Sequence, residues 1–268
     1  MRYDYAIVYG FDEPLIRYAL RVARRVVAFR QRHSALNDRL YRCVDVPMFQ
    51  SEHAILSHLR LPAALGVPAA GCRLSYHVTR EESAAAQARL AGDVPRDAAP
   101  LVGFQVASFP TKGYRDWPIA NFADLADRII REWPRAHFLL YGGSEELVRV
   151  NWLKEKLGKR ATQYAGRLTL RETAAVMSLT DLYVGVDTGP SHIMSAFDVP
   201  LIGMYHCLSS SRDTGALDHP YFYPVDHPRP RKDCSVQVEM AEITVDMVFA
   251  QVTRALGRHA PSVARRHL

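Results

Sequence analysis

The chain has 268 residues, of which 48% are hydrophobic and 23% charged, so it can bury one large core or two modest ones. Its net charge of +6 favours anionic partners, but basicity alone is no evidence for a nucleic-acid partner, and we expect none. The longest apolar stretch, residues 61–71, is too short to span a membrane, and the N-terminus lacks the pattern of a signal peptide. We expect a cytoplasmic protein.

Apolar and amphipathic segments alternate along the N-terminal part of the chain. Strands are predicted over residues 5–9 and 26–29, and helices over 14–23, 51–65 and 80–91. The polar, proline-containing stretch that follows, residues 92–100, has the composition of an inter-domain linker. We therefore predict a boundary in this stretch and a first domain over residues 1–98.

The alternation of strands and helices continues beyond this stretch. Strands are predicted over residues 101–105, 137–141, 182–186 and 200–204, and helices over 119–133, 145–157, 170–179, 189–197 and 245–256. Such an order predicts an α/β fold with a parallel, doubly wound sheet. We expect this second domain to span residues 99–257 and to be followed by a basic tail, 258–268.

Ligands of open parallel sheets lie beyond the carboxyl ends of the strands, which directs attention to three loops. The loop after strand 182–186 reads Asp187-Thr188-Gly189-Pro190-Ser191-His192. Thr188 or Gly189 suits a helix cap and Pro190 the first turn, so backbone N–H groups there could hold a diphosphate. An ordinary, well-capped turn explains the same residues.

The loop after strand 101–105, which begins at Ser108, carries two cations. Lys112 and Arg115 would lie beside the same cleft and could stabilise a departing nucleotide diphosphate. Solvated loop charges are the alternative explanation.

The loop after strand 137–141 contains Gly142 and Gly143, which allow close backbone approach, followed by Glu145 and Glu146. One of the two carboxylates could accept hydrogen bonds from the hydroxyl groups of a ribose. Acids also favour the first turn of a helix, which accounts for at least one of the two.

Neither a metal nor a redox motif is predicted. There is no Asp-x-Asp pair and no histidine–carboxylate cluster at ligand spacing, so we expect a metal-independent site without a cofactor. The four cysteines form no C-x-x-C pair, and we expect reduced, mostly packed thiols at Cys43, Cys72, Cys207 and Cys234.

The three loops, in this order and spacing, resemble the C-terminal domain of glycosyltransferase family 9, the ADP-heptose:lipopolysaccharide heptosyltransferases. The resemblance runs from about Leu101 to Gly215 and includes Trp117-Pro118, the turn at residues 142–145, the segment 165–172, and the motif Asp187 to His192. It implies a GT-B architecture, with two Rossmann-like domains, the N-terminal one shortened. It also implies transfer of a sugar from a nucleotide-sugar donor, here ADP-heptose, with inversion and without metal.

By this resemblance, Arg115 stands where the family has a phosphate-binding lysine, Glu145 binds the nucleoside end, and His192 lies beneath the third loop. The donor-binding residues that we predict are Ser108, Lys112, Arg115, Gly143, Glu145, Asp187, Thr188, Gly189, Pro190 and His192.

The general base is the main departure from the family. In the family, an Asp on an N-terminal glycine-rich loop activates the acceptor hydroxyl, and this chain is expected to start after that loop. Asp12 is the local candidate for a base, although a helix-start role before Pro14 explains it better.

We therefore expect an inverting glycosyltransferase that adds a heptose-like sugar to a lipopolysaccharide core or related glycan. A non-catalytic nucleotide-sugar binder or a degenerate partner subunit is the alternative. Between Arg17 and Arg42 there are eight arginines and one acid, Asp38, which suits either an anionic acceptor at the inner membrane surface or a solvated helix face. Exposed sheet edges would allow a homodimer.

Overall fold

A computed structural model describes residues 2–46 and 51–259 of the chain. The chain forms two compact units: the first comprises Met1–Cys72 with Arg212–Thr214, and the second Arg73–Ser211 with Gly215–Leu268. The division between units therefore lies at Cys72, and the boundary predicted at residue 98 is wrong. Residues 86, 90, 94 and 98 all belong to the hydrophobic core of the second unit, because helix α4 packs there.

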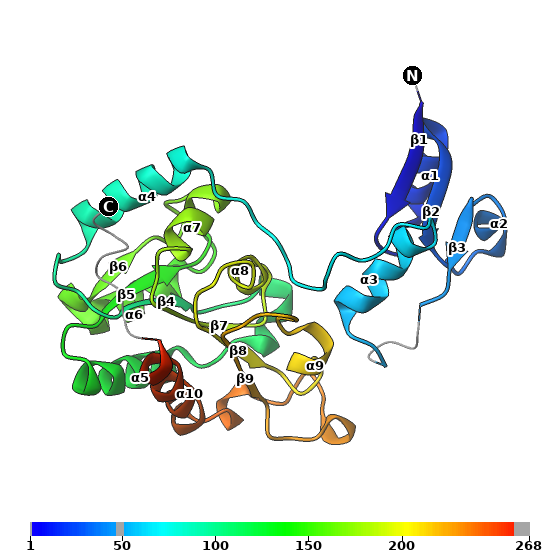
Figure 1. The fold of residues 1–268 in the computed structure, drawn as a ribbon. Coiled ribbons are helices and arrows are strands. Elements are labelled where there is room, and N and C mark those ends of the chain that lie inside the picture. Colours follow the sequence, from blue (N-terminus) through cyan, green and yellow to red (C-terminus); the bar gives the residue numbers. More distant parts are fainter. Residues whose placement is uncertain (1, 47–50, 260–268) are drawn as a thin grey trace. The chain divides into compact units, whose positions relative to one another are not determined.

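The first unit holds a small parallel sheet in the order β1-β2-β3. Its strands are Tyr3–Val8, Ala23–Phe29 and Arg42–Val44, and its helices are α1 Glu13–Val22, α2 Ser34–Asn37 and α3 Ala54–Ala63 (Figure 1). Helix α1 presents Ile16 and Ala19 to Val8 and Val26 of the sheet, while Leu61 of α3 packs with buried side chains of β2. Each strand and helix thus contributes a small part of a modest core.

The second unit contains a six-stranded sheet in the order β6-β5-β4-β7-β8-β9, with every neighbouring pair parallel. The strands are β4 Leu101–Gln105, β5 His137–Tyr141, β6 Ala161–Gln163, β7 Leu182–Val186, β8 Leu201–Tyr205 and β9 Phe222–Asp226. Numbered from β4, this is the 3-2-1-4-5-6 order of a Rossmann fold. The predicted doubly wound parallel α/β sheet is confirmed.

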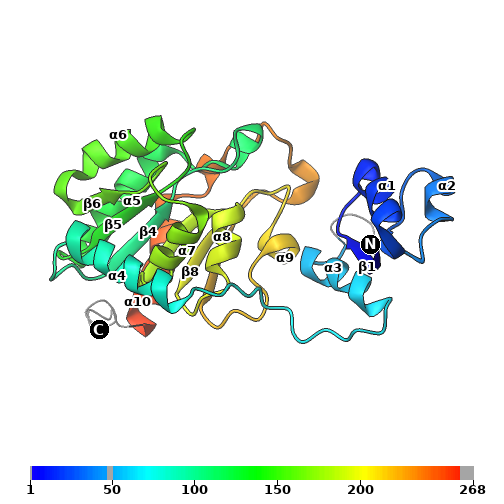
Figure 2. The same cartoon turned by 90° about the horizontal axis from the view of Figure 1, so that it is seen from above.

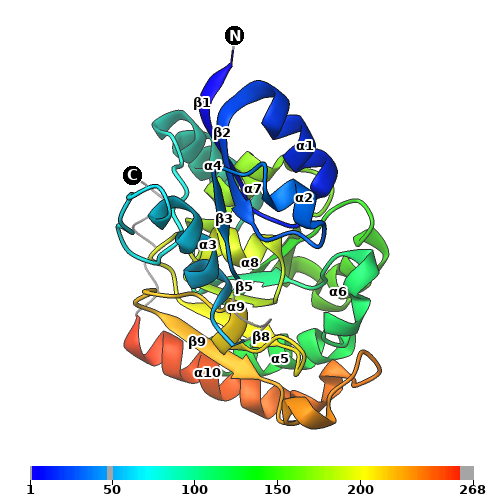
Figure 3. The ribbon, with the colours of Figure 1, turned by 90° about the vertical axis from the view of Figure 1, so that its right-hand side faces the viewer.

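Helices cover both faces of this sheet. Figure 2 shows α4, α7 and α8 in front of the strands, and Figure 3 shows α5 and α10 together below the sheet; side chains of α5, α6 and α10 share one apolar cluster. The α-helices of this unit are α4 Arg80–Asp93, α5 Ile119–Glu132, α6 Leu147–Leu157, α7 Leu170–Met177, α8 Gly189–Met194 and α10 Val245–Arg258, while most of α9 Ser211–Thr214 is assigned to the first unit. Short 3-10 helices span Pro110–Arg115, Gly158–Arg160, Arg231–Asp233 and Met240–Glu242. Two large apolar clusters, one on each face, hold the layers together.

The sequence missed three strands, all short or at a sheet edge. Strands β3 and β6 have three residues each, and β9 contains Pro224 and alternates between buried and exposed positions. Such strands carry little apolar signal.

None of the helices within the described ranges is long and apolar enough to cross a membrane. Most of the predicted basic tail, residues 260–268, lies outside the described residues.

Candidate functional site

The three loops chosen from the sequence leave neighbouring strands at one edge of the sheet. Strands β5, β4 and β7 are adjacent and parallel, so the segments after Tyr141, Gln105 and Val186 emerge together. The strand order reverses between β4 and β7, which is the switch point where such sheets bind ligands. The loops are therefore in position to form one site.

An ion pair joins the first loop to the third. Arg115 Nη1 donates to Asp187 Oδ2 at 2.7 Å, and the side chains are 17% and 3% exposed, respectively. The Asp187 carboxylate also lies 3.5 Å from Ser209 Oγ and 3.5 Å from His192 Nε2. A buried carboxylate is stable only with such partners. The pairing fixes the Arg115 guanidinium at the switch point.

His192 contributes to this cluster from a partly exposed position. Its side chain is 44% exposed while the ring nitrogen faces Asp187 Oδ1. The structure thus places the His192 ring beside the Asp187 carboxylate, and its place beneath the loop stays a prediction. Ser209, which follows β8, was not predicted; no sequence motif marks it.

The first loop is held in place by the carboxylate of Asp116. The backbone N–H of Ser108 donates to Asp116 Oδ1 at 2.7 Å, and Ser108 Oγ lies 2.8 Å from both that oxygen and the Lys112 carbonyl. Arg149 of α6 donates to the other Asp116 oxygen at 3.1 Å and to the Trp117 carbonyl at 3.0 Å. Ser108 thus shapes the loop, and the Lys112 side chain extends from it into solvent.

One of the two acids of the second loop, Glu146, forms a hydrogen bond within the loop itself. The N–H of Gly143 donates to Glu146 Oε2 at 2.6 Å, and a Cβ on Gly143 would lie 3.0 Å from that same oxygen. Glu146 therefore serves the start of α6, as expected for at least one of the pair. Glu145 is exposed, and within the described ranges its carboxylate has no hydrogen bond or ion pair.

The third loop turns directly into α8. Thr188 is the N-cap residue, its side chain makes no capping bond, and Pro190 lies in the first turn. Ser191 Oγ donates to the Val186 carbonyl at 2.6 Å and lies 3.0 Å from the buried Tyr183 hydroxyl. Helix α8 has only six residues, so its dipole is small, and the charge at this site resides in side chains.

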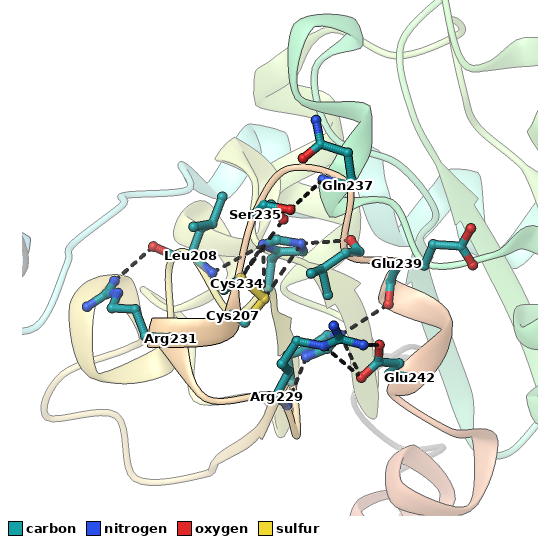
Figure 4. The surroundings of a disulfide bond; sticks show 12 residues. Cys207, Leu208, Arg229, Arg231, Cys234, Ser235, Gln237, Glu239 and Glu242 are labelled. Carbon is teal, nitrogen blue, oxygen red and sulfur yellow. Dashed lines mark hydrogen bonds and ion pairs between the residues drawn. A yellow bond between two sulfur atoms is a disulfide. The ribbon is translucent and has the colours of Figure 1, made fainter.

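A disulfide lies close to the site and corrects the prediction for two cysteines. Cys207, two residues beyond β8, is bonded to Cys234 across 27 residues (Figure 4). The expectation of reduced thiols is wrong for this pair, because the fold brings together two loops that are distant in sequence. Cys43 and Cys72 are outside any disulfide, as expected.

In the first unit, Asp12 has a structural role. Its Oδ1 accepts the backbone N–H of Leu15 at 2.9 Å and caps α1, as the alternative explanation predicted. It also lines a hollow of about 940 Å³ formed by residues that follow β1 and β2, including Phe11, Arg30 and Arg32. The hollow is lined by two carboxylates, Asp12 and Glu13, and by two cations, Arg30 and Arg32.

The arginine stretch of this unit is partly neutralised. Ion pairs link Arg17 to Glu13 and Arg24 to Asp4, and Arg30 pairs with Asp45. A solvated, ion-paired surface thus accounts for part of the basic density.

Comparison with known proteins assigns the family. The model of glycosyltransferase family 9 (heptosyltransferase) matches residues 16–229. The chain belongs to this family. A lipopolysaccharide core heptosyltransferase, OpsX of Haemophilus influenzae, is 28% identical over 95 residues, 35% of this chain and 27% of the relative. Lipopolysaccharide heptosyltransferase 3 of Escherichia coli is 35% identical over 63 residues, 24% of this chain and 16% of the relative.

Solved structures share the fold of this family 9 chain. The family 9 glycosyltransferase of Veillonella parvula superposes with a TM-score of 0.81 at 19% identity, covering 96% of this chain and 75% of that one. The ADP-heptose LPS heptosyltransferase II of E. coli gives 0.72 at 17% identity, covering 96% and 77%. The predicted resemblance to family 9 and the GT-B-like fold class are confirmed, while the matched segments span only about a quarter and a sixth of the two curated relatives.

Proposed function

We propose that this chain is an inverting glycosyltransferase that moves a heptose-like sugar from an ADP-sugar to a lipopolysaccharide core or related glycan. Family membership, two heptosyltransferase relatives and the cluster at the switch point support the proposal. The observation that carries it is the Arg115–Asp187 pair, because it holds a cation where a doubly wound sheet binds the phosphates of a nucleotide.

Arg115 still has donors to offer a diphosphate. A guanidinium carries five N–H groups; here one is directed at Asp187, and Nε–H donates to the Tyr114 hydroxyl at 3.3 Å. The remaining N–H groups would bind the phosphates, and Lys112 would add a second charge from the same loop. Asp187 would then act as a positioning residue, since its own carboxylate repels phosphate.

The nucleoside end would lie at the second loop. Glu145 is exposed just before α6, and its carboxylate could accept hydrogen bonds from the ribose hydroxyls. Gly143 would allow the ligand to approach the backbone closely. Thr188, Gly189 and Pro190 would line the sugar side. A Cβ added to Gly189 would lie more than 4 Å from the neighbouring protein atoms, so packing within the protein does not require glycine at this position. A bound ligand could occupy the open space beside it.

The reaction forms one bond and breaks one. The acceptor hydroxyl attacks the anomeric carbon, the bond from that carbon to the diphosphate oxygen breaks, and ADP departs with the electron pair. Preformed cations stabilise the charge that develops on the diphosphate, so Arg115 and Lys112 would replace a metal in this role. The proton of the acceptor hydroxyl passes to a base.

Asp12 is our candidate for that base, and it would have to leave its bond to Leu15 to act. The hollow beside it is lined by Arg30, which pairs with Asp45, and by Arg32, and these cations would contact an anionic group of the acceptor. Arg21, Arg24 and Arg25 would contact acceptor or the inner membrane surface from the cytoplasmic side. Charge reversal at these three residues should weaken binding to anionic vesicles, and unchanged binding would remove this part of the proposal.

A transfer assay tests the proposal directly. The purified chain is incubated with ADP-heptose and a heptose-deficient lipopolysaccharide acceptor, with and without a chelator, and the product is identified by mass spectrometry and anomeric NMR. We expect turnover, an inverted anomeric configuration and no effect of the chelator. A retained configuration would contradict the mechanism.

One observation favours the alternative, a non-catalytic nucleotide-sugar binder or partner subunit. The candidate base Asp12 is engaged as a helix cap. Donor binding without turnover, unaffected by Asp12→Asn, would support the alternative. Sedimentation would in addition show whether the chain forms the homodimer that exposed strand edges allow.

A further inference from the structure

A histidine, His206, lies beside the disulfide and takes no part in the S–S bond. His206 Nδ1 lies 3.9 Å from Cys207 Sγ and 3.9 Å from Cys234 Sγ. Within the described parts of the chain, these are the three residues whose histidine and cysteine atoms converge closely enough to hold a metal ion. His206 and Cys207 are buried, at 1% and 6% exposure, so the cluster is built into the fold.

The tautomer of His206 suits metal binding. Nε2 lies 3.0 Å from the Val238 carbonyl, an acceptor, so Nε2 carries the hydrogen and donates it. Nδ1 is then left with a lone pair, which accepts the Leu208 N–H at 3.2 Å. Metal-bound histidines usually donate their other N–H to a carbonyl or carboxylate in this way.

The spacing suits a tetrahedral zinc site once the sulfurs are separated. At a tetrahedral metal, bonds of about 2.3 Å to sulfur and 2.0 Å to nitrogen place those two atoms about 3.5 Å apart, compared with the 3.9 Å observed. The Cα atoms of Cys207 and Cys234 are 5.8 Å apart, which leaves the side chains room to rotate.

We propose that the reduced chain binds one Zn²⁺ ion through Cys207 Sγ, Cys234 Sγ and His206 Nδ1. A phosphine reduces the S–S bond with two electrons and is itself oxidised to the phosphine oxide. The oxygen of the oxide comes from a water molecule, and the two hydrogens of that water protonate the two sulfurs. Binding of Zn²⁺ then releases two protons from the thiols. The metal displaces the Leu208 N–H from Nδ1, and water completes the fourth position.

This site would fix the loops around it. Cys207 and Ser209 belong to the loop that touches Asp187, and the His206 ring packs edge-on against Tyr114, with ring centroids 5.0 Å apart. The ion would therefore be structural and would stabilise the edge of the sheet at which Arg115 is held. The inference does not depend on which sugar or acceptor the chain uses.

Titration of the full chain with Co²⁺ tests the site, since Co²⁺ is a spectroscopic substitute for Zn²⁺. The protein is reduced with a phosphine under argon, and binding is followed by thiolate-to-cobalt charge transfer and by the visible bands of tetrahedral cobalt. We expect saturation at about one ion per chain and loss of both signals when Zn²⁺ is added.

Variants assign the ligands. Cys207→Ser and Cys234→Ser should abolish the charge-transfer band, and His206→Asn should weaken binding at least about tenfold. Cys43→Ser and Cys72→Ser, which alter the two cysteines outside the disulfide, are the matched controls and should bind as the parent does. A reduced parent chain that keeps its circular dichroism but gives no charge-transfer band would overturn the proposal. A band that persists in the Cys207/Cys234 double variant would do so equally.

Discussion

Arg115 Nη1 donates to Asp187 Oδ2 at 2.7 Å, although 72 residues separate the two in the sequence. The contact crosses from the loop after β4 to the loop after β7, the two central strands between which the order of the sheet reverses. It holds a cation and its carboxylate partner in a mostly buried position, so we expect it to affect the stability of the unit and, if the proposed donor site is correct, the binding of a phosphorylated ligand.

Loss of the Arg115 cation should destabilise the second unit. Arg115→Ala leaves the Asp187 carboxylate buried without its strongest partner, and breaking a buried pair costs about 3–5 kcal/mol. Urea unfolding measures this loss. Arg128→Ala is the control: its pair with Asp246 is exposed at 38% and 78%, so the loss should stay below about 1 kcal/mol. Equal losses in the two variants would contradict the account of the buried pair.

Gly185 should tolerate no side chain. A Cβ there would lie 2.8 Å from the Tyr183 ring and 3.0 Å from Gln105 Cβ, and the Tyr183 ring is held by Ser191. Gly185→Ala should therefore lower the free energy of unfolding by about 1–3 kcal/mol. Gly257→Ala, on the exposed side of α10, meets no atom within 4 Å and should be neutral or stabilising by up to about 1 kcal/mol. Denaturant titration compares the two variants.

The sequence predicted the central strands well and the edges poorly. The bounds of β4, β5 and β7 were predicted to the residue, because these strands are buried on both faces and read as continuous apolar runs. Strand β9 was not predicted, because Pro224 and the alternation of buried and exposed residues along the strand resemble the pattern of a loop. The domain boundary was misplaced because linker composition at residues 92–100 does not reveal that α4 packs onto α7.

The same limit applies to the site. Loops after neighbouring strands could be predicted to meet, so the sequence could place Arg115 and Asp187 close to each other. Ser209 and the Cys207–Cys234 pair could not be, because their proximity depends on how the segments after β8 and β9 fold back, which no local pattern records.

Stability should fall in acid partly through Glu82. Its carboxylate accepts from Arg171 and from the Thr79 N–H, and these hydrogen bonds lower the pKa of Glu82 from 4.5 to about 2. A lowered folded-state pKa gives stability that is fully present above pH 4.5 and is lost as the pH falls towards 2. Glu82→Gln should be less stable than the parent above pH 4.5, and the difference should shrink with acid. A constant difference across this range, measured by urea unfolding, would rule out the linkage.

The disulfide should contribute measurably to stability. It closes a loop across 27 residues, and a loop of this size corresponds to about 3–4 kcal/mol of unfolded-state entropy. Phosphine with a chelator should lower the unfolding free energy of the parent by that amount. Cys207→Ser should already have the lower value, with no further change on reduction, whereas Cys72→Ser should respond as the parent does. A parent that is insensitive to reduction would contradict this expectation.

The most direct test of the donor site is calorimetric titration of the chain with ADP, ADP-heptose, UDP and GDP, repeated on Asp187→Ala and on Arg128→Ala as the control. We predict that ADP and ADP-heptose bind in preference to UDP and GDP, that Asp187→Ala weakens this binding about 10- to 100-fold by releasing Arg115, and that Arg128→Ala leaves it unchanged. Failure of the folded parent chain to bind any of the four nucleotides, or equal binding by Asp187→Ala, would contradict the account.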